Sequence, residues 1–266
     1  MSQDNRQYLT ITGNYWTFTV TDGALRMLIV LQFHALGYGA LEIAMLFVFY
    51  ELFGVITNLV GGWLGALIGL NRTMQIGTFL QVIALGMLAV DPSWLSVVYV
   101  MCAQALSGIA KDLNKMSAKS SIKLLSGKGQ SNKLYKWVSV LTGSKNALKG
   151  VGFFVGAALL TWLGFQSALL ILASGVFIAF LISLFLLQQE LGKPSFKPKF
   201  RDIFSKSRAI NLVSAARLFL FGARDVWFVV ALPVFMQTTL NWSHTEVGTF
   251  MATWIIGTVS YNQCHL

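Results

Sequence analysis

The stretch Lys193-Pro-Ser-Phe-Lys-Pro-Lys-Phe-Arg201 is the longest basic, proline-bearing break in this chain of 266 residues. The sequence around it is 55% hydrophobic and only 11% charged, with a mean hydropathy of +0.65. Soluble domains carry about 25% charged residues, so the composition indicates a protein with several membrane-spanning helices. We predict three parts: a six-helix transmembrane half over residues 1–190, a basic cytoplasmic linker over 191–208, and about two helices of a second half over 209–266.

Apolar stretches long enough to cross a bilayer as helices, about 20 residues each, occur on both sides of the break. Six precede it, near residues 14–37, 41–69, 73–90, 94–114, 138–163 and 166–188, and two follow it, near 209–236 and 246–262. Short turns join the first six in pairs, which predicts helical hairpins. The polar first dozen residues lack a basic region before a short apolar core, so we expect no removable signal peptide.

Lysine and arginine outside the spans occupy only alternate connections. They occur at Arg6, at Arg72, from Lys111 to Lys136, and from Lys193 to Arg208. Cytoplasmic loops are enriched in these residues, so we predict a cytoplasmic N terminus. This topology accounts for the net charge of +10, and nucleic-acid binding is not predicted.

Several charged side chains lie inside the apolar spans. A basic side chain at the centre of a membrane helix costs roughly 3 kcal/mol, so such residues usually line a bundle interior or a watery cavity. We predict that the basic ones, with a neighbouring asparagine, bind a small anionic substrate: Arg26, Lys145, Asn146, Lys149, Arg217 and Arg224. The acids at similar depth are candidates for charge pairing or proton coupling: Asp22, Glu51 and Asp225. The five cations exceed the three acids by two charges, which fits a ligand of about two negative charges.

The roles of individual charges stay open at this stage. Asp22 and Arg26 stand four residues apart, on one helical face, so they either neutralise each other for insertion or serve the substrate and a proton. Lys145 and Lys149 repeat that spacing with no acid in the same span; Lys145 could extend its amine to the cytoplasm. Glu51 is either a structural partner of an arginine or a proton carrier. Its protonation would raise the positive excess and tighten anion binding.

Lysines also recur every four residues at the end of the fourth span, at Lys111, Lys115, Lys119 and Lys123. This stripe predicts that the helix continues into the cytoplasm, where such residues set topology or attract anionic lipid headgroups. Glycines recur at the same interval at 61, 65 and 69 and at 152 and 156, which predicts close helix packing.

A parallel repeat relates the two sides of the basic break. An offset of 199 residues sets Gly23-Ala-Leu-Arg26 against Gly222-Ala-Arg-Asp225, and Glu42-Ile43 and Glu246-Val247 begin the next span of each half. Six spans, a cytoplasmic loop and a repeated set resemble the major facilitator transporters. We therefore expect an all-α membrane protein of the major facilitator type, an N-terminal six-helix bundle plus the first two helices of the C-terminal bundle. The polar end of the chain suggests a truncated second half.

Four stretches of the sequence resemble the organoarsenical efflux permease ArsJ family of major facilitators: Asn14-Tyr-Trp-Thr-Phe-Thr-Val-Thr-Asp-Gly-Ala-Leu-Arg26, Phe49-Tyr-Glu51-Leu-Phe-Gly-Val, Gly108-Ile-Ala-Lys-Asp-Leu-Asn-Lys-Met-Ser-Ala-Lys-Ser-Ser121 and Thr142-Gly-Ser-Lys-Asn-Ala-Leu-Lys-Gly150. The resemblance runs from about residue 8 to residue 257. It implies export of 1-arseno-3-phosphoglycerate across the bacterial inner membrane, and hence arsenate resistance. It also implies a functional link, without contact, to the glyceraldehyde-3-phosphate dehydrogenase that makes this compound from arsenate. No enzymatic activity and no cofactor are expected.

Two departures from the family and three alternatives accompany this hypothesis. The major facilitator signature after the second span retains only its glycines and one arginine in Gly62-Trp-Leu-Gly-Ala-Leu-Ile-Gly69-Leu-Asn-Arg72, and the chain stops in its eighth span. The alternatives are an exporter of another organic anion or a drug, a membrane-embedded enzyme, and a non-transporting fragment. No spacing of His, Asp and Glu supports the enzyme. Arsenite is a poor substrate candidate because lone Cys102 cannot supply clustered thiolates.

Overall fold

The computed structural model describes residues 3–125, 131–187, 191 and 207–264, with only the backbone described for residue 3, for residues 131–134 and for some helical residues of the second half. All regular secondary structure in these residues is helical. The elements in chain order are α1 Gln3–Ala35, α2 Ala40–Leu46, α3 Val48–Ile68, α4 Leu70–Leu88, the 3₁₀ turn η1 Pro92–Trp94, α5 Val97–Leu125, α6 Ser131–Leu163, α7 Phe165–Leu186, α8 Arg208–Asp225, the π-helical segment η3 Val226–Ala231, α9 Leu232–Thr239 and α10 His244–Cys264.

These helices cover the eight apolar stretches, with three departures from the expected boundaries. The second stretch is broken at Phe47, which separates α2 from α3, and the seventh contains the π-helical segment η3. The predicted loop around Arg72 is wrong. Gly69 alone joins α3 to α4, because its φ of 95° turns the chain within one residue, a backbone conformation that glycine adopts without steric cost. Most of the predicted linker, residues 192–206, lies outside the described residues.

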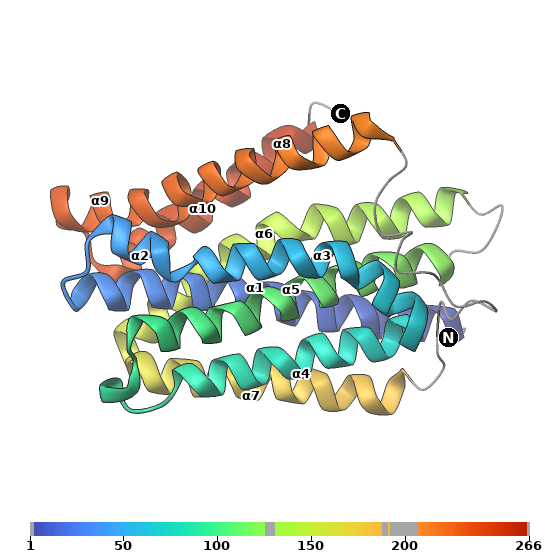
Figure 1. The fold of residues 1–266 in the computed structure, drawn as a ribbon, viewed down its shortest axis with the longest axis horizontal. Coiled ribbons are helices and arrows are strands. Elements are labelled where there is room, and N and C mark those ends of the chain that lie inside the picture. Colours follow the sequence, from blue (N-terminus) through green and yellow to red (C-terminus); the bar gives the residue numbers. More distant parts are fainter. Residues whose placement is uncertain (1–2, 126–130, 188–190, 192–206, 265–266) are drawn as a thin grey trace.

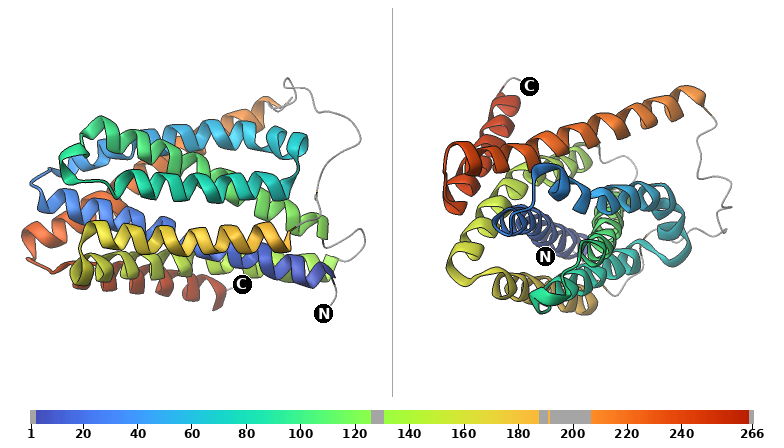
Figure 2. Two further views of the ribbon diagram at one scale, coloured as in Figure 1. Left: turned by 90° about the horizontal axis from the view of Figure 1, so that it is seen from below. Right: turned by 60° about the vertical axis from the view of Figure 1, so that its left-hand side comes forward.

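Helix α1 runs through the middle of the first half (Figures 1 and 2) and packs against α5, α6 and α7. Every residue from Thr21 to Leu31 is buried. Around it, α4 packs on α5 and α7, and α3 packs on α5. Charged residues in the centre of α1 are therefore enclosed by other helices.

Small residues let α6 lie close to two helices. A Cβ atom at Gly156 would lie 2.4 Å from the carbonyl oxygen of Ala24 in α1, and one at Gly248 of α10 would lie 2.4 Å from the Cβ atom of Ala157. The predicted glycine face of α6 thus packs inside the first half, on α1. A different face of α6 carries α10 of the second half.

The described second half meets the bundle through α10, which packs along α6, and at the end remote from the N terminus. There η3 and α9 pack against α1, and their buried side chains join the main core through Val229, Val230, Val234 and Met236. Helix α8 extends away from this contact (Figure 1), with exposed apolar residues that include Leu212, Val213, Phe219 and Leu220.

The two proposed repeats begin their second helix in the same way. The backbone N–H of Gly39 donates to Glu42 Oε2 over 2.7 Å at the start of α2, and that of Ser243 donates to Glu246 Oε2 over 2.7 Å at the start of α10. A glutamate three residues after the cap is half of a capping box. The sequence match at Glu42 and Glu246 is therefore also a match in local structure.

By length and composition, three helices in the described part of the chain could cross a membrane: Ala40–Ile68, Tyr135–Leu163 and Phe165–Leu186. Helices α1, α4 and α5 are less apolar because they carry many of the buried polar side chains, such as Asn14, Gln81 and Gln104. Polar residues within membrane helices characteristically face the bundle interior, which is where these lie.

Candidate functional site

A buried ion pair joins the first helix to the third. Arg26 Nη2 of α1 donates to Glu51 Oε1 of α3 over 2.8 Å. The arginine side chain is 5% exposed, whereas the glutamate side chain is 39% exposed. Arg26 is enclosed because it lies in the central helix, and Glu51 reaches it from the first turn of α3. This contact supports the interpretation of Glu51 as a partner of an arginine.

Tyr50 lies beside this pair and is 0% exposed. Its hydroxyl donates to Asp22 Oδ1. The Arg26 Cζ atom lies 4.3 Å from the centroid of the tyrosine ring, and Lys111 Nζ lies 4.0 Å from it. Both distances are within the range of cation–π attraction. Asp22 thus has a partner in α3 as well as a cation one turn along its own helix.

Helix α5 adds three charged residues to the group. Lys111 Nζ lies 3.9 Å from Glu51 Oε2 and 3.9 Å from Asp112 Oδ2, and Lys115 Nζ lies 3.1 Å from Asp112 Oδ1. Close packing of α5 on α3 makes this possible. A Cβ atom at Gly108 would lie 2.2 Å from the Tyr50 carbonyl oxygen, and one at Gly54 would lie 2.8 Å from Asp112 Oδ2.

Helix α6 contributes the two lysines that the sequence predicted. Both are half-buried. Lys145 interacts electrostatically with Asp22 of α1 and with three lysines of α5, Lys111, Lys115 and Lys119. Lys149 Nζ lies 5.7 Å from the Phe153 ring, and the backbone of Lys149 lies against Gly23 of α1. Positive charge from α1, α5 and α6 therefore gathers in one region.

The structure brings together only part of the predicted site. Arg26 contacts Glu51 directly, and Tyr50 links Asp22 to this pair. Lys145 interacts electrostatically with Asp22. Asn146 is exposed. The side chains of Arg217, Arg224 and Asp225 lie outside the described residues.

The predicted role of the lysine stripe needs a correction. Its helical continuation is confirmed, because α5 extends to Leu125. However, Lys111 and Lys115 bind carboxylates inside the bundle, so they do not form a lipid-facing surface. Lys119 is exposed by surface area, and desolvation of its amine by neighbouring atoms, followed by the charge of Lys115, lowers its pKa.

Sequence reasoning missed Tyr50, Lys111, Asp112 and Lys115 as members of the site. The stripe of four lysines drew attention to the helix end, although Asp112 within it was a signal for local pairing. With these residues, the enclosed group has five cations, Arg26, Lys111, Lys115, Lys145 and Lys149, against three acids, Asp22, Glu51 and Asp112. This group has the same excess of two positive charges as the group predicted from the sequence. However, Lys111, Lys115 and Asp112 stand in it in place of Arg217, Arg224 and Asp225.

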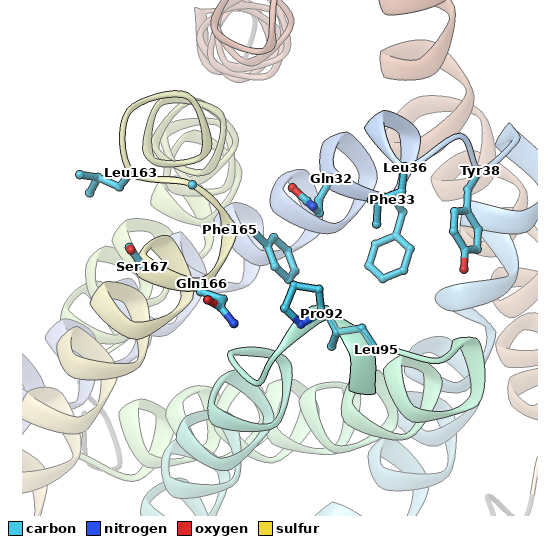
Figure 3. Close-up of a pocket in the computed structure, with 11 residues that line it drawn as sticks. Gln32, Phe33, Leu36, Tyr38, Pro92, Leu95, Leu163, Phe165, Gln166 and Ser167 are labelled. Atoms are coloured by element: carbon cyan, nitrogen blue, oxygen red, sulfur yellow. The ribbon is translucent and has the colours of Figure 1, made fainter.

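A separate pocket lies at the end of the bundle remote from the N terminus (Figure 3). Its volume is about 530 Å³, and it is lined by the end of α1 and the connections after α1, α4 and α6. Its lining consists of Gln32, Phe33, Leu36, Tyr38, Pro92, Leu95, Leu163, Gly164, Phe165, Gln166 and Ser167. None of these is charged, so this pocket is distinct from the charged group.

A bundle of apolar helices that encloses charged side chains is typical of a helical membrane transporter. Residues 8–262 match the Major Facilitator Superfamily, and the chain belongs to this family. No curated protein significantly matches the chain.

Solved structures of peptide transporters have the same fold. The chain is similar to tetrameric PepTSo2, with a TM-score of 0.60 and 13% identity over 100% of this chain and 55% of that one. It is similar to a bacterial homologue of the human drug peptide transporters PepT1 and PepT2, with a TM-score of 0.61 and 17% identity over 89% of this chain and 52% of that one. It is also similar to a peptide transporter POT in complex with sulfate, with a TM-score of 0.56 and 20% identity over 92% of this chain and 48% of that one. The chain therefore spans about half the length of these transporters, and at these identities the likeness shows the fold alone.

Proposed function

We propose that this chain forms the anion-binding part of a membrane transporter that exports a multiply charged organic anion by proton-coupled alternating access. The enclosed excess of positive charge among α1, α5 and α6 carries this proposal. The resemblance to the organoarsenical permeases makes 1-arseno-3-phosphoglycerate the substrate, whose carboxyl-derived, arsenate and phosphate oxygens supply the negative charges.

Arg26 is the residue best suited to bind an oxyanion directly. A guanidinium presents a planar fork of donors that matches two oxygens of a carboxylate or phosphate. Here Glu51 occupies one of its donors, so a substrate oxyanion would compete with the Glu51 carboxylate. Lys111, Lys145 and Lys149 would add point charges around the ligand.

Protonation offers a route to coupling. A proton on Glu51 or Asp22 would remove one negative charge beside Arg26 and so favour an incoming anion. Because binding linkage is reciprocal, a bound anion would in turn favour protonation. Transport would therefore depend on pH through these two carboxyl groups.

Membership of the major facilitator family favours alternating access between two halves of the protein. In the described residues the second half packs on the first through η3 and α9 on α1 and through α10 on α6. The distribution of lysine and arginine predicts a cytoplasmic N terminus. The bacterial inner membrane is the location that the family resemblance implies.

Arsenate tolerance of a sensitive bacterium that expresses the chain with the dehydrogenase tests the proposal. We expect the chain to raise tolerance, and Arg26→Gln or Lys149→Gln to abolish the gain. Lys136→Gln is the matched control, because it removes the same charge from an exposed position of α6. Full tolerance in both site variants would overturn the assignment of the anion site.

A further inference from the structure

Tyr50 contacts charged residues of both α1 and α5, namely Asp22, Arg26 and Lys111. The proposed function assigns it no part in anion binding or proton coupling. Tyr50 is fully buried, and its backbone is pressed against Gly108 of α5. Its side chain reaches Asp22 and Arg26 of α1 and Lys111 of α5. A residue held so tightly between three helices can fix the positions of the charges around it.

The ring of Tyr50 acts on two cations. Arg26 Cζ and Lys111 Nζ lie 4.3 Å and 4.0 Å from its centroid, and both cations also approach the Glu51 carboxylate, at 2.8 Å and 3.9 Å. Like charges repel, but the negative face of an aromatic ring attracts each of them. The ring therefore holds Arg26 and Lys111 close together before any anion arrives.

The hydroxyl of Tyr50 acts on an acid. Asp22 is 8% exposed and stands four residues before Arg26, a spacing that would allow the two to pair along α1. By donating to Asp22 Oδ1, Tyr50 gives this carboxylate a second partner. The Arg26 guanidinium can then point to Glu51, and a substrate oxyanion can displace the Glu51 carboxylate from it.

We propose that Tyr50 is the positioning residue of the anion site: its ring sets the placement of Arg26 and Lys111, and its hydroxyl keeps Asp22 from competing with the anion for Arg26. The identity of the ligand in this inference rests on the proposed function. The separate roles of the Tyr50 ring and hydroxyl rest only on their contacts with Arg26, Lys111 and Asp22.

Other groups around Asp22 act on its charge as well. Arg26 lies on its own helix, and charged residues face the region from α3, α5 and α6, the helices packed on this side: Glu51, Lys111, Asp112, Lys115, Lys145 and Lys149. Helix α7, which also packs on α1, contains no charged residue. The Tyr50 hydroxyl is therefore tested by a variant that leaves every one of these charges in place.

Tyr50→Phe and Tyr50→Leu separate the two roles. Binding of 2,3-bisphosphoglycerate, a stable glycerate with two phosphates, is measured by calorimetry on the purified chain at pH 8. For Tyr50→Phe we expect binding about tenfold weaker, because the Asp22 carboxylate then competes for Arg26, and no such loss when Tyr50→Phe is added to Asp22→Asn. For Tyr50→Leu we expect a loss of about tenfold or more with either residue at position 22, because the ring is gone. Tyr99→Phe is the control, since its hydroxyl donates to the Met87 carbonyl away from the site.

A second readout does not need the ligand. The infrared carboxylate band of Asp22, assigned by its loss in Asp22→Asn, is compared at pH 8 in the wild-type chain and in Tyr50→Phe. A shifted band in Tyr50→Phe is expected because the hydrogen bond is lost, and an identical band overturns the role of the hydroxyl. Unchanged binding by Tyr50→Leu, or by Tyr50→Met should the leucine variant not fold, overturns the role of the ring. If the wild-type chain binds no anion while the infrared band shifts as expected, the proposed function fails and the hydroxyl role stands.

Discussion

Arg26 and Glu51 are 25 residues apart in the sequence and form a 2.8 Å hydrogen-bonded ion pair between α1 and α3. The pair sits where α3 begins, one residue after Tyr50 and just beyond the break at Phe47. This position gives the glutamate partial access to solvent, with 39% of its side chain exposed, while the arginine stays enclosed. Of the two partners, Glu51 is the one that can exchange protons or give way to an incoming anion.

Replacing Glu51 with glutamine should strengthen anion binding. The amide oxygen can still accept from Arg26, but the competing negative charge is gone, so we expect binding of 2,3-bisphosphoglycerate to tighten by about tenfold at pH 8. The pH dependence of binding should flatten at the same time. Calorimetry at several pH values measures both effects.

Glu42→Gln is the control for this variant, because Glu42 is an exposed capping residue at the start of α2. Coupling of transport to a pH gradient should be lost when either Glu51 or Asp22 is neutralised. Coupling that persists in both variants would eliminate these residues as the proton route.

Glycine packing between α1 and α6 should be sensitive to a single methyl group. A Cβ atom at Gly152 would lie 2.3 Å from the Val20 carbonyl oxygen, whereas one at Gly175 of α7 would meet nothing within 4 Å. We expect Gly152→Ala to destabilise the chain by about 1–3 kcal/mol and Gly175→Ala to be neutral or slightly stabilising. Thermal unfolding in detergent compares the two, and equal stability would show that α1 and α6 do not pack this closely.

A buried polar group ties α1, α4 and α5 together. Asn14 Oδ1 accepts from Thr78 Oγ1 over 3.0 Å and from Asn114 Nδ2 over 2.9 Å. Asn14→Ala would remove the acceptor for both, so we expect a loss of about 1–2 kcal/mol in unfolding free energy. The Thr10→Ala variant, which loses an exposed bond to the Arg6 carbonyl, should change stability much less. A similar loss in both variants would contradict the burial of the Asn14 group.

Asp91, in the turn between α4 and α5, should stay ionised to a lower pH than a free aspartate. Asp91 Oδ1 accepts from the backbone N–H and the hydroxyl of Ser93, and these bonds lower the pKa of Asp91. A carboxyl whose pKa is depressed on folding stabilises the turn above its unfolded pKa, and this contribution is lost as the pH falls through the folded value. Chemical-shift titration should give Asp91 a pKa below that of the Ser93→Ala variant. Equal values would show that the two bonds are absent in solution.

Local sequence patterns were sufficient for much of the fold but not for its breaks. Apolar length predicted the helices, and the lysine stripe predicted the extension of α5 to Leu125. The break at Phe47 has no proline or glycine to signal it. Gly69 was interpreted as a packing glycine, whereas its positive φ makes it the whole connection between α3 and α4.

The site was only partly predictable, because helical spacing reveals partners within one helix. Asp22 and Arg26 were found in this way, but the contacts of Arg26 with Glu51 and Tyr50 depend on how α3 packs against α1. Lys111 looked like the start of a surface stripe, and only the approach of α5 to α3 at Gly108 turns it inward. Tyr50 carried no signal, since a tyrosine in an apolar span is most often a packing residue.

Direct binding to the purified chain tests the central claim, that Arg26 and its neighbours form an anion site. Calorimetry would compare 2,3-bisphosphoglycerate with the dipeptide dialanine, for the wild-type chain, Arg26→Gln and the exposed control Lys136→Gln. We predict that the wild-type chain and the control bind the bisphosphate and not the dipeptide, and that Arg26→Gln weakens this binding by at least about tenfold. Binding of dialanine in preference to the bisphosphate, or bisphosphate binding unaffected by Arg26→Gln, would contradict the account.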